Sequence, residues 1–319
     1  MARKLISVIL PIYNEEGSIR EIYQRVKAAL GRLLHDHEII FVDDGSCDLS
    51  WKIIAELAAK DNSVRALGLS RNFGQQIALT AGLDAAEGDA VIMMDADLQH
   101  PPEMILKFIE KWEEGYDIVY AVRQNASNRG LLHKFTSDLF YSVFNKLSDV
   151  RITPGVVNFR LMARPVADSV LACRERVRHL VGLVSWTGFR STGIPYTAAE
   201  RRHGVTKHSF LVRWHLAMAS LTSFSSAPLY LSTIAGSIVS GIAFIYILYA
   251  LYMKFFTNEP VSGWASILIS VLFLGGIQLL SIGILGEYLG RVYEEVKQRP
   301  LYLVKQTLNA AKKTGDHNA

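Results

Sequence analysis

Two carboxylates one residue apart are the clearest chemical signal in the sequence. Asp95 and Asp97 follow four apolar residues, 91–94, and a Pro-Pro pair at 101–102 ends the segment. The apolar run predicts a buried strand, so the acids lie at its carboxyl end, where open α/β sheets bind ligands. Because side chains of an extended chain alternate, both carboxylates are expected on one side, which suits a hard divalent cation that substrate phosphates also bind. A solvated turn is the alternative interpretation.

Polar residues follow other predicted strands as well. Asn14 and Glu15 come after the first strand, Asp43 and Asp44 end the second, and an Arg-Asn pair at 71–72 follows the third. An acidic crevice with one metal and one arginine can bind a nucleoside diphosphate, because the cation neutralises the diphosphate. The sequence has neither G-x-G-x-x-G nor G-x-x-x-x-G-K-[ST], so neither a dinucleotide fold nor a P-loop is supported.

Strands and helices alternate along the first 122 residues. Strands are predicted at 6–11, 38–46, 64–69, 91–94 and 118–122, and helices at 19–34, 51–60, 76–86 and 103–114. This alternation predicts an α/β domain with a mainly parallel sheet and helices on both faces. An amphipathic helix at 131–147 either packs against the sheet or lies in a membrane interface, and a second interfacial helix is expected at about 208–225.

Two long stretches of the last third lack charge. Residues 214–253 and 260–286 contain no Asp, Glu, Lys or Arg. Each stretch exceeds the roughly 20 apolar residues that cross a bilayer. They predict transmembrane helices at about 229–255 and 264–288, with a buried core hairpin as the alternative.

Basic residues flank the predicted hairpin. Arg201, Arg202, Lys207 and Arg213 precede it, and Arg291, Lys297, Arg299 and Lys305 follow it. The positive-inside rule then makes both ends cytoplasmic. The expected parts are a cytoplasmic domain at 1–213, a membrane domain at 214–290 and a basic cytoplasmic tail at 291–319. Glycines at 275, 276, 283 and 286 suit close helix packing between subunits, so a homo-oligomer is expected.

Composition narrows the class of protein. The chain has 319 residues, a net charge of +4 and two cysteines, Cys47 and Cys173, which match no metal-ligand spacing. Such cysteine usage indicates a reducing compartment. Basic residues are mixed with acids and no recognition-helix or RNP-like pattern occurs, which argues against a nucleic-acid partner.

Five short motifs bring these features together. They are Pro11-Ile12-Tyr13-Asn14-Glu15, Asp43-Asp44-Gly45-Ser46, Arg71-Asn72-Phe73-Gly74, Asp95-Ala96-Asp97-Leu98-Gln99 and Asn158-Phe159-Arg160-Leu161-Met162. In this order they resemble the motifs of family 2 glycosyltransferases of the GT-A fold. With the two spans, the chain is similar over about residues 5–305 to polyisoprenyl-phosphate glycosyltransferases, in particular bactoprenol glucosyltransferases of O-antigen modification. Aminoarabinose transferases of lipid A modification are close relatives.

The resemblance implies a function. It implies inverting transfer of a hexose from a nucleotide sugar, first of all UDP-glucose, to undecaprenyl phosphate in the bacterial cytoplasmic (inner) membrane. GDP-mannose or a UDP-aminoarabinose derivative are the alternative donors. Mg²⁺ or Mn²⁺ would be held by Asp95 and Asp97, with Asp97 the direct ligand. The nucleotide sugar would contact Pro11, Tyr13, Glu15, Asp43, Asp44, Arg71, Asn72 and Gln99.

The acceptor side is implied in the same way. The family's Arg-x-x-Gly-x-Ser/Thr-Lys segment matches residues 201–207, so that Arg201 and Lys207, helped by Arg202, would bind the lipid phosphate by charge-assisted hydrogen bonds. Ordinary positive-inside charges are the alternative.

One position departs from the family. Asn158, with Arg160 nearby at the reacting centre, stands where the family has an Asp that is often proposed as the catalytic base. An amide accepts no proton at neutral pH, which excludes base catalysis from this position. A phosphate monoester, with a second pKa of about 6, is already a largely anionic nucleophile. Position 158 therefore either orients the acceptor in a natural variant or carries an engineered substitution that slows turnover.

Other function classes fit less well. A processive polysaccharide synthase needs Gln-x-x-Arg-Trp, but Phe210 stands at the Gln position before Arg213-Trp214. A metal-dependent nucleotidyltransferase could use the same acidic crevice, although the two spans and the basic edge argue against it. A non-catalytic membrane scaffold would bind no nucleotide.

Overall fold

The computed structural model describes residues 3–124, 155–197, 227–256 and 263–309. They belong to two compact units, one built on a sheet that includes residues after 299 and one helical unit within 211–298. The predicted helices at 131–147 and 208–225 lie outside the described residues, as do Arg201, Arg202 and Lys207.

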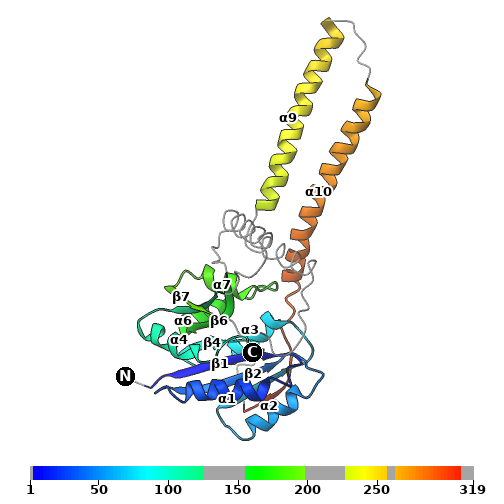
Figure 1. Cartoon of the computed structure of the whole chain (residues 1–319). Helices are drawn as coiled ribbons and strands as arrows, with labels where there is room; N and C mark the ends of the chain where they lie inside the picture. The colour runs from blue at the N-terminus through cyan, green and yellow to red at the C-terminus, as the bar shows by residue number, and fades with distance from the viewer. Residues whose placement is uncertain (1–2, 125–154, 198–226, 257–262, 310–319) are drawn as a thin grey trace, which may run out of the picture. The chain divides into compact units, whose positions relative to one another are not determined.

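A single sheet with the strand order β7-β5-β6-β4-β1-β2-β3-β8 forms the first unit (Figure 1). Its strands are β1 (Leu5–Ile12), β2 (Asp36–Asp43), β3 (Val64–Leu69), β4 (Ala90–Met93), β5 (Ile118–Arg123), β6 (Val156–Ala163), β7 (Ser191–Tyr196) and β8 (Val304–Leu308). The four neighbours β4, β1, β2 and β3 run parallel, as do β5 and β7, whereas β6 and β8 are antiparallel to their neighbours. The prediction of an α/β fold with a mainly parallel sheet is confirmed.

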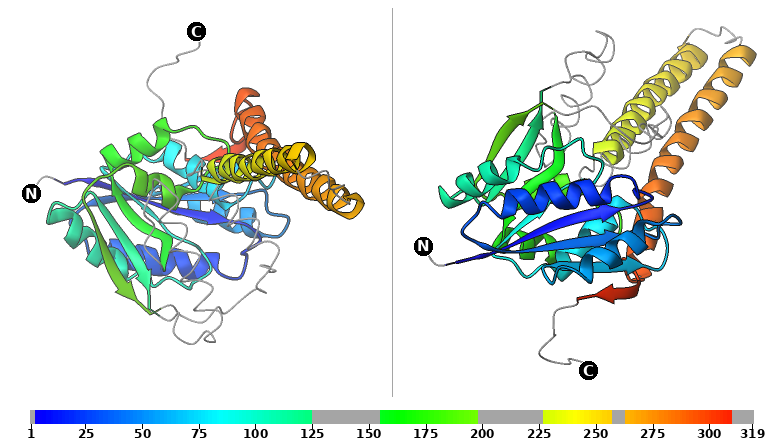
Figure 2. Two further views of the ribbon diagram at one scale, coloured as in Figure 1. Left: turned by 90° about the horizontal axis from the view of Figure 1, so that it is seen from above. Right: turned by 60° about the horizontal axis from the view of Figure 1, so that its bottom comes forward.

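Helices cover both faces of this sheet (Figure 2). They are α1 (Ile19–Leu30), α2 (Ser50–Ala58), α3 (Gln75–Ala85), α4 (Met104–Glu113), α6 (Arg164–Ala172) and α7 (Leu180–Trp186). Alternating strand residues such as Val8 and Leu10 are buried in one core cluster with α1, α2 and α4. Ile9, between them, faces α3, where a Cβ on Gly82 would lie 2.3 Å from its side chain. Helix α3 thus packs on β1 at a distance that only glycine permits.

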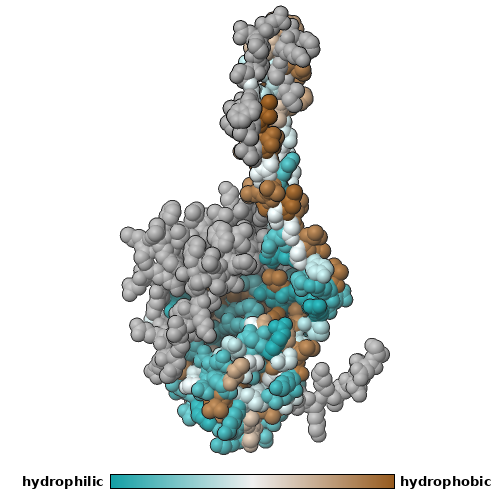
Figure 3. Space-filling view, turned by 90° about the vertical axis from the view of Figure 1, so that its right-hand side faces the viewer, coloured by the Kyte–Doolittle hydropathy of each residue, from teal (hydrophilic) through white to brown (hydrophobic). Residues whose placement is uncertain are grey.

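The helical unit consists of α9 (Ala227–Phe256) and α10 (Trp264–Val296). Each helix contains a segment long and apolar enough to cross a membrane, Leu229–Met253 and Phe273–Val296, with none of the side chains in the most apolar window buried. Figure 3 shows brown, hydrophobic side chains along them. Helix α10 runs past the predicted end at 288 because its last turns carry charged residues in helical register, such as Glu287 and Arg291 at 3.2 Å.

The segment after α10 returns to the sheet. The sequence predicted only a basic tail at 291–319, whereas residues 304–308 form β8, which pairs with β3 from Ala66 opposite Leu308 to Leu69 opposite Val304. The Asn309 side chain donates hydrogen bonds to the carbonyls of Ala58 and Val64 at 2.8 and 2.9 Å. Strand β8 therefore covers an edge that β3 would otherwise leave unpaired.

A cluster of hydrogen bonds and one ion pair holds the segment just before β8. The Tyr302 hydroxyl donates to the Asp84 carboxylate at 2.9 Å, and Arg174 makes two hydrogen bonds to the same carboxylate at 2.9 and 2.7 Å. Asp84 belongs to α3 and Arg174 follows α6. The residues after the apolar helices are therefore anchored to α3 as well as to the sheet.

We expect that ending the chain after Leu303, which removes β8, lowers the thermal unfolding midpoint of the detergent-solubilised protein by about 5–10 °C, because β3 loses its partner strand and edge cover. Ending the chain after Asn309 keeps β8 and serves as the control, with an unchanged midpoint. Equal midpoints for the two truncated chains would contradict a stabilising role for β8.

Candidate active site

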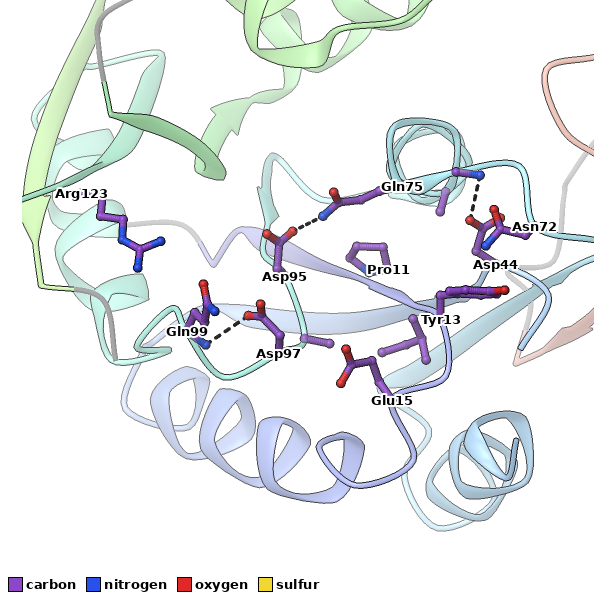
Figure 4. Close-up of a pocket in the computed structure, with 14 residues that line it drawn as sticks. Pro11, Tyr13, Glu15, Asp44, Asn72, Gln75, Asp95, Asp97, Gln99 and Arg123 are labelled. Atoms are coloured by element: carbon purple, nitrogen blue, oxygen red, sulfur yellow. Dashed lines mark hydrogen bonds between the residues drawn. The ribbon is translucent and has the colours of Figure 1, made fainter. Parts of the chain in front are cut away.

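A pocket of about 700 Å³ opens at the carboxyl ends of the parallel strands (Figure 4). It is lined by Pro11, Ile12, Tyr13, Glu15, Asp44, Asn72, Gly74, Gln75, Ala78, Asp95, Ala96, Asp97, Gln99 and Arg123. The loops that follow β1, β2, β3, β4 and β5 each contribute to this lining or end beside it. Its volume is in the range of small-molecule sites, and its position is the usual ligand crevice of open α/β sheets.

Most of the predicted donor-side residues share this pocket. Those that line it are Pro11, Tyr13, Glu15, Asp44, Asn72, Asp95, Asp97 and Gln99. Asp43 and Arg71 lie beside it without lining it: Asp43 is buried and accepts a hydrogen bond from the Ser46 amide at 3.3 Å, and the Arg71 guanidinium stacks over the Phe73 ring at 4.1 Å.

Asp44 organises the loop after β3. Its carboxylate accepts hydrogen bonds from the backbone amides of Phe73 and Gly74 at 2.7 and 2.9 Å. Burial raises the pKa of Asp44 above its usual range, although these two amides act in the opposite direction. Burial raises the pKa of Asp43 as well. These two carboxylates are thus partly desolvated acceptors held by backbone.

The carboxylates of Asp95 and Asp97 are held by different partners. Strand β4 ends at Met93, so both acids lie in a loop rather than on an extended strand. Asp95 accepts from the Gln75 side chain at 2.5 Å, whereas Asp97 accepts from the Gln99 amide at 3.1 Å (Figure 4). The sequence predicted that both side chains point to one side because they belong to an extended strand. That reason does not apply here, because the chain leaves the extended conformation after Met93.

The carboxylate oxygens in the loop after β4 are metal ligands of the kind that suits a hard cation, one that is also bound by a ligand in the pocket. The acidic side chains lining the pocket offer carboxylate oxygens only. Within the described ranges, no group of three or more His, Cys, Asp and Glu is arranged to hold a metal by itself. A cation here would need further ligands, which phosphate oxygens supply in many Mg²⁺ sites.

Asn158 and Arg160 lie on β6 and do not line the pocket. Arg160 is 1% exposed, pairs in the sheet with Met93, and donates to the Val157 carbonyl at 2.8 Å, whereas its Nε has no partner. Burial lowers the pKa of Arg160 to about 10, so it stays charged at neutral pH. The Asn158 Oδ1 atom is also buried without a partner. This stretch of β6 therefore holds two incompletely satisfied polar side chains.

Sequence reasoning missed two polar residues of the pocket. Arg123 ends β5 and is the only basic side chain among the described residues of the lining. A polar residue at the end of an apolar strand indicates a site residue, as it did for Asp44 and Asp95, and Arg123 fits the same pattern. Gln75, the first residue of α3, donates a hydrogen bond to Asp95. The two residues are 20 positions apart, so no local sequence pattern reveals this contact.

The chain is similar to known proteins over most of its length. The glycosyl transferase family 2 model matches residues 7–168. An uncharacterised glycosyltransferase of Bacillus subtilis is 43% identical over 301 residues, which cover 94% of this chain and 93% of the relative. A prophage-derived bactoprenol glucosyl transferase of Shigella flexneri is 42% identical over 302 residues, 95% of this chain and 98% of the relative. Among solved structures, mannosyl-3-phosphoglycerate synthase of Rubrobacter xylanophilus is 17% identical with a TM-score of 0.48, covering 69% of this chain and 73% of that one.

Gly45 packs closely against the backbone of the 71–72 loop beside the pocket, so substitution of this glycine tests how tightly the two loops are packed. It has φ +72°, and a Cβ there would lie 2.5 Å from the Arg71 carbonyl carbon; Gly188 has the same φ and nothing within 4 Å. Both Gly→Ala changes cost about 1–2 kcal/mol in backbone strain, but only Gly45→Ala displaces the neighbouring loop. We expect Gly45→Ala to lower the unfolding midpoint by at least about 5 °C more than Gly188→Ala. Equal shifts would mean that the 71–72 loop moves freely.

Proposed function

The chain belongs to glycosyltransferase family 2, and from this membership we propose that it transfers a hexose, glucose from UDP-glucose in the first instance, to undecaprenyl phosphate. The full-length similarity to a bactoprenol glucosyl transferase supports the acceptor, because it extends through both apolar helices. Within the site, one observation supports the proposal most strongly. A single pocket is lined by Asp44, Asp95, Asp97 and Arg123.

The donor would lie across the carboxyl edge of β1, β2 and β4. Pro11, Tyr13 and Glu15 line one part of the pocket with Asp44 and Asn72, and together with Asp43 they are proposed to hold the nucleoside by apolar contact and by accepting hydrogen bonds. Arg71, stacked on Phe73, would sit beside the nucleotide without lining the pocket. Gln99, held beside Asp97 by the loop, would contact the sugar.

The acidic loop after β4 would hold the cofactor. Asp97, with Asp95 next to it, fits a Mg²⁺ or Mn²⁺ ion whose remaining ligands are donor phosphates. When bound, such a cation would neutralise the charge that develops on the departing diphosphate. The protein's own part is to keep both carboxylates at one wall of the pocket while Gln75 and the Gln99 amide restrict their rotation.

The acceptor would need no strong base. One phosphate oxygen would attack the anomeric carbon from the face opposite the diphosphate, forming the new carbon–oxygen bond as the bond to the nucleotide breaks and inverting the centre. The phosphate monoester is largely ionised at neutral pH. Arg123 can hold this anion by charge-assisted hydrogen bonds, and Arg201, Arg202 and Lys207 are proposed to join it from the segment outside the described residues.

Asn158 and Arg160 would act behind the reacting groups. Arg160 is a buried cation that pairs in the sheet with Met93, next to the acidic loop, and has no ion pair with an acid among the described residues, so it would contribute positive charge near that loop. Asn158 offers an amide where the resemblance implies a carboxylate, and we propose that it orients the acceptor.

The return of β8 to the sheet supports a hairpin arrangement in the membrane. Strands that precede α9 and strand β8, which follows α10, share one sheet, which favours a hairpin that begins and ends on one side of a bilayer. The basic residues around it favour the cytoplasmic side of the bacterial inner membrane. We propose two spans with both termini and the pocket in the cytoplasm, and assembly as a homo-oligomer through glycines of α10.

The reaction is tested with the detergent-solubilised full chain, undecaprenyl phosphate, Mn²⁺ and a panel of labelled UDP- and GDP-sugars. We expect label from UDP-glucose to enter an organic-extractable lipid. Asp97→Asn should lower this rate by about 100-fold or more, because charge stabilisation of several kcal/mol is lost. Asp36→Asn, an exposed change at the amino end of β2, is the matched control and should leave the rate unchanged.

Each other outcome of this assay has a distinct meaning. Lipid labelled from another donor would correct the sugar alone. Released diphosphate without labelled lipid would favour a nucleotidyltransferase, and absence of metal-dependent nucleotide binding in calorimetry would favour a scaffold.

Asn158→Asp is expected to raise turnover, because it supplies a proton acceptor for the fraction of the phosphate monoester that is still protonated near its second pKa of about 6. The measurement is kcat for lipid labelling at saturating donor, between pH 6 and 8. Equal or lower kcat would count against any proton-accepting role at this position and would favour orientation of the acceptor as its task.

A further inference from the structure

His100 is a buried histidine directly behind the acidic loop. It is 5% exposed and is packed between the rings of Phe159 and Tyr196, at centroid distances of 5.3 and 5.6 Å. The Tyr196 hydroxyl lies 2.8 Å from its Nδ1, and its Nε2 lies 3.4 Å from Oδ2 of Asp95. Three side chains from two separate segments thus form one polar chain, Tyr196–His100–Asp95.

The direction of the hydrogen bonds in this chain follows from the acceptors. A carboxylate oxygen accepts a hydrogen bond, so the imidazole tautomer that pairs with Asp95 carries its proton on Nε2. Nδ1 is then an acceptor, and the Tyr196 hydroxyl must donate to it. Burial raises the pKa of Tyr196 to about 12, so this hydroxyl keeps its proton at neutral pH. Tyr196 therefore selects the tautomer that points a donor at Asp95.

Asp95 is held from both sides as a result. Gln75, at the start of α3, donates to Oδ1 at 2.5 Å, and His100 faces Oδ2. We propose that His100 and Tyr196 are positioning residues that, with Gln75, fix the Asp95 carboxylate beside Asp97 and so set the affinity of the acidic loop for its divalent cation. This inference rests on the proposed function and adds two residues to its machinery, neither of which lines the pocket.

The same contact connects the acidic loop to the neighbouring strands. Tyr196 is the last residue of β7 and pairs in register with Arg123, the basic residue of the pocket, at the end of β5. The Tyr196 carbonyl also accepts from the Gln124 amide at 2.9 Å. Through His100, the Tyr196 hydroxyl therefore connects Asp95 to the strand ends where Arg123 lies. A phenylalanine ring would keep the packing and lose only this connection.

The test is a Mn²⁺ titration of the full detergent-solubilised chain at fixed UDP concentration, followed by the electron paramagnetic resonance signal of free Mn²⁺, with a protein-free blank. Tyr196→Phe is expected to raise the Kd for Mn²⁺ about tenfold, as is usual for residues that orient metal ligands through another side chain. Tyr116→Phe, which keeps a half-buried ring elsewhere on the domain, is the matched control and should bind as the wild type does.

A double-mutant cycle separates positioning from packing. His100→Gln keeps a donor near the Nε2 position but has no tautomer for Tyr196 to select. We expect Tyr196→Phe to cost less than about twofold in Mn²⁺ affinity in the His100→Gln background. Wild-type affinity in Tyr196→Phe, with or without a lower unfolding midpoint, would overturn the proposal, as would the same loss in both backgrounds. Failure of the wild-type chain to bind Mn²⁺ with either UDP or GDP would instead overturn the proposed function on which it rests.

Discussion

Electrostatic repulsion among carboxylates at one edge of the sheet is the constraint that explains most of the site. Glu15, Asp44, Asp95 and Asp97 line a single pocket, and their mutual repulsion rises as water is excluded. Backbone amides offset part of this cost at Asp44, and a glutamine amide does so at Asp95. The remaining negative charge faces the pocket, where a cation and Arg123 can balance it. This distribution of charge suits the proposed binding of a cation together with an anionic substrate.

The sequence allowed the parallel half of the fold to be predicted because each of its strands is an apolar run that ends in a polar turn. That pattern located β1 to β5 and eight of the residues that line the pocket. Strands β6, β7 and β8 were not predicted, since β6 has two polar residues, Asn158 and Arg160, within its apolar run, and most residues of β7 and β8 are not buried. Their places in the sheet depend on pairing with strands distant in sequence, which local periodicity does not report.

Contacts between distant segments also explain which parts of the site escaped prediction. The partners of Asp95 come from the start of α3 and from residue 100, and the partner of His100 lies 96 residues further along the chain. A short sequence motif marks the carboxylates, whereas the side chains that contact Asp95 and His100 are ordinary Gln, His and Tyr residues outside any motif. The fold must be known before such supporting residues can be recognised.

The position of β8 in the chain bears on how the protein is made. The sheet takes its last strand from residues that follow both apolar helices, so β3 has no partner on that side until the ribosome has synthesised residue 308. Because both apolar helices precede β8 in the chain, they leave the ribosome before it does. The sheet can therefore close only after both helices have been made, and a polypeptide interrupted before β8 carries an open strand edge of the kind that chaperones bind.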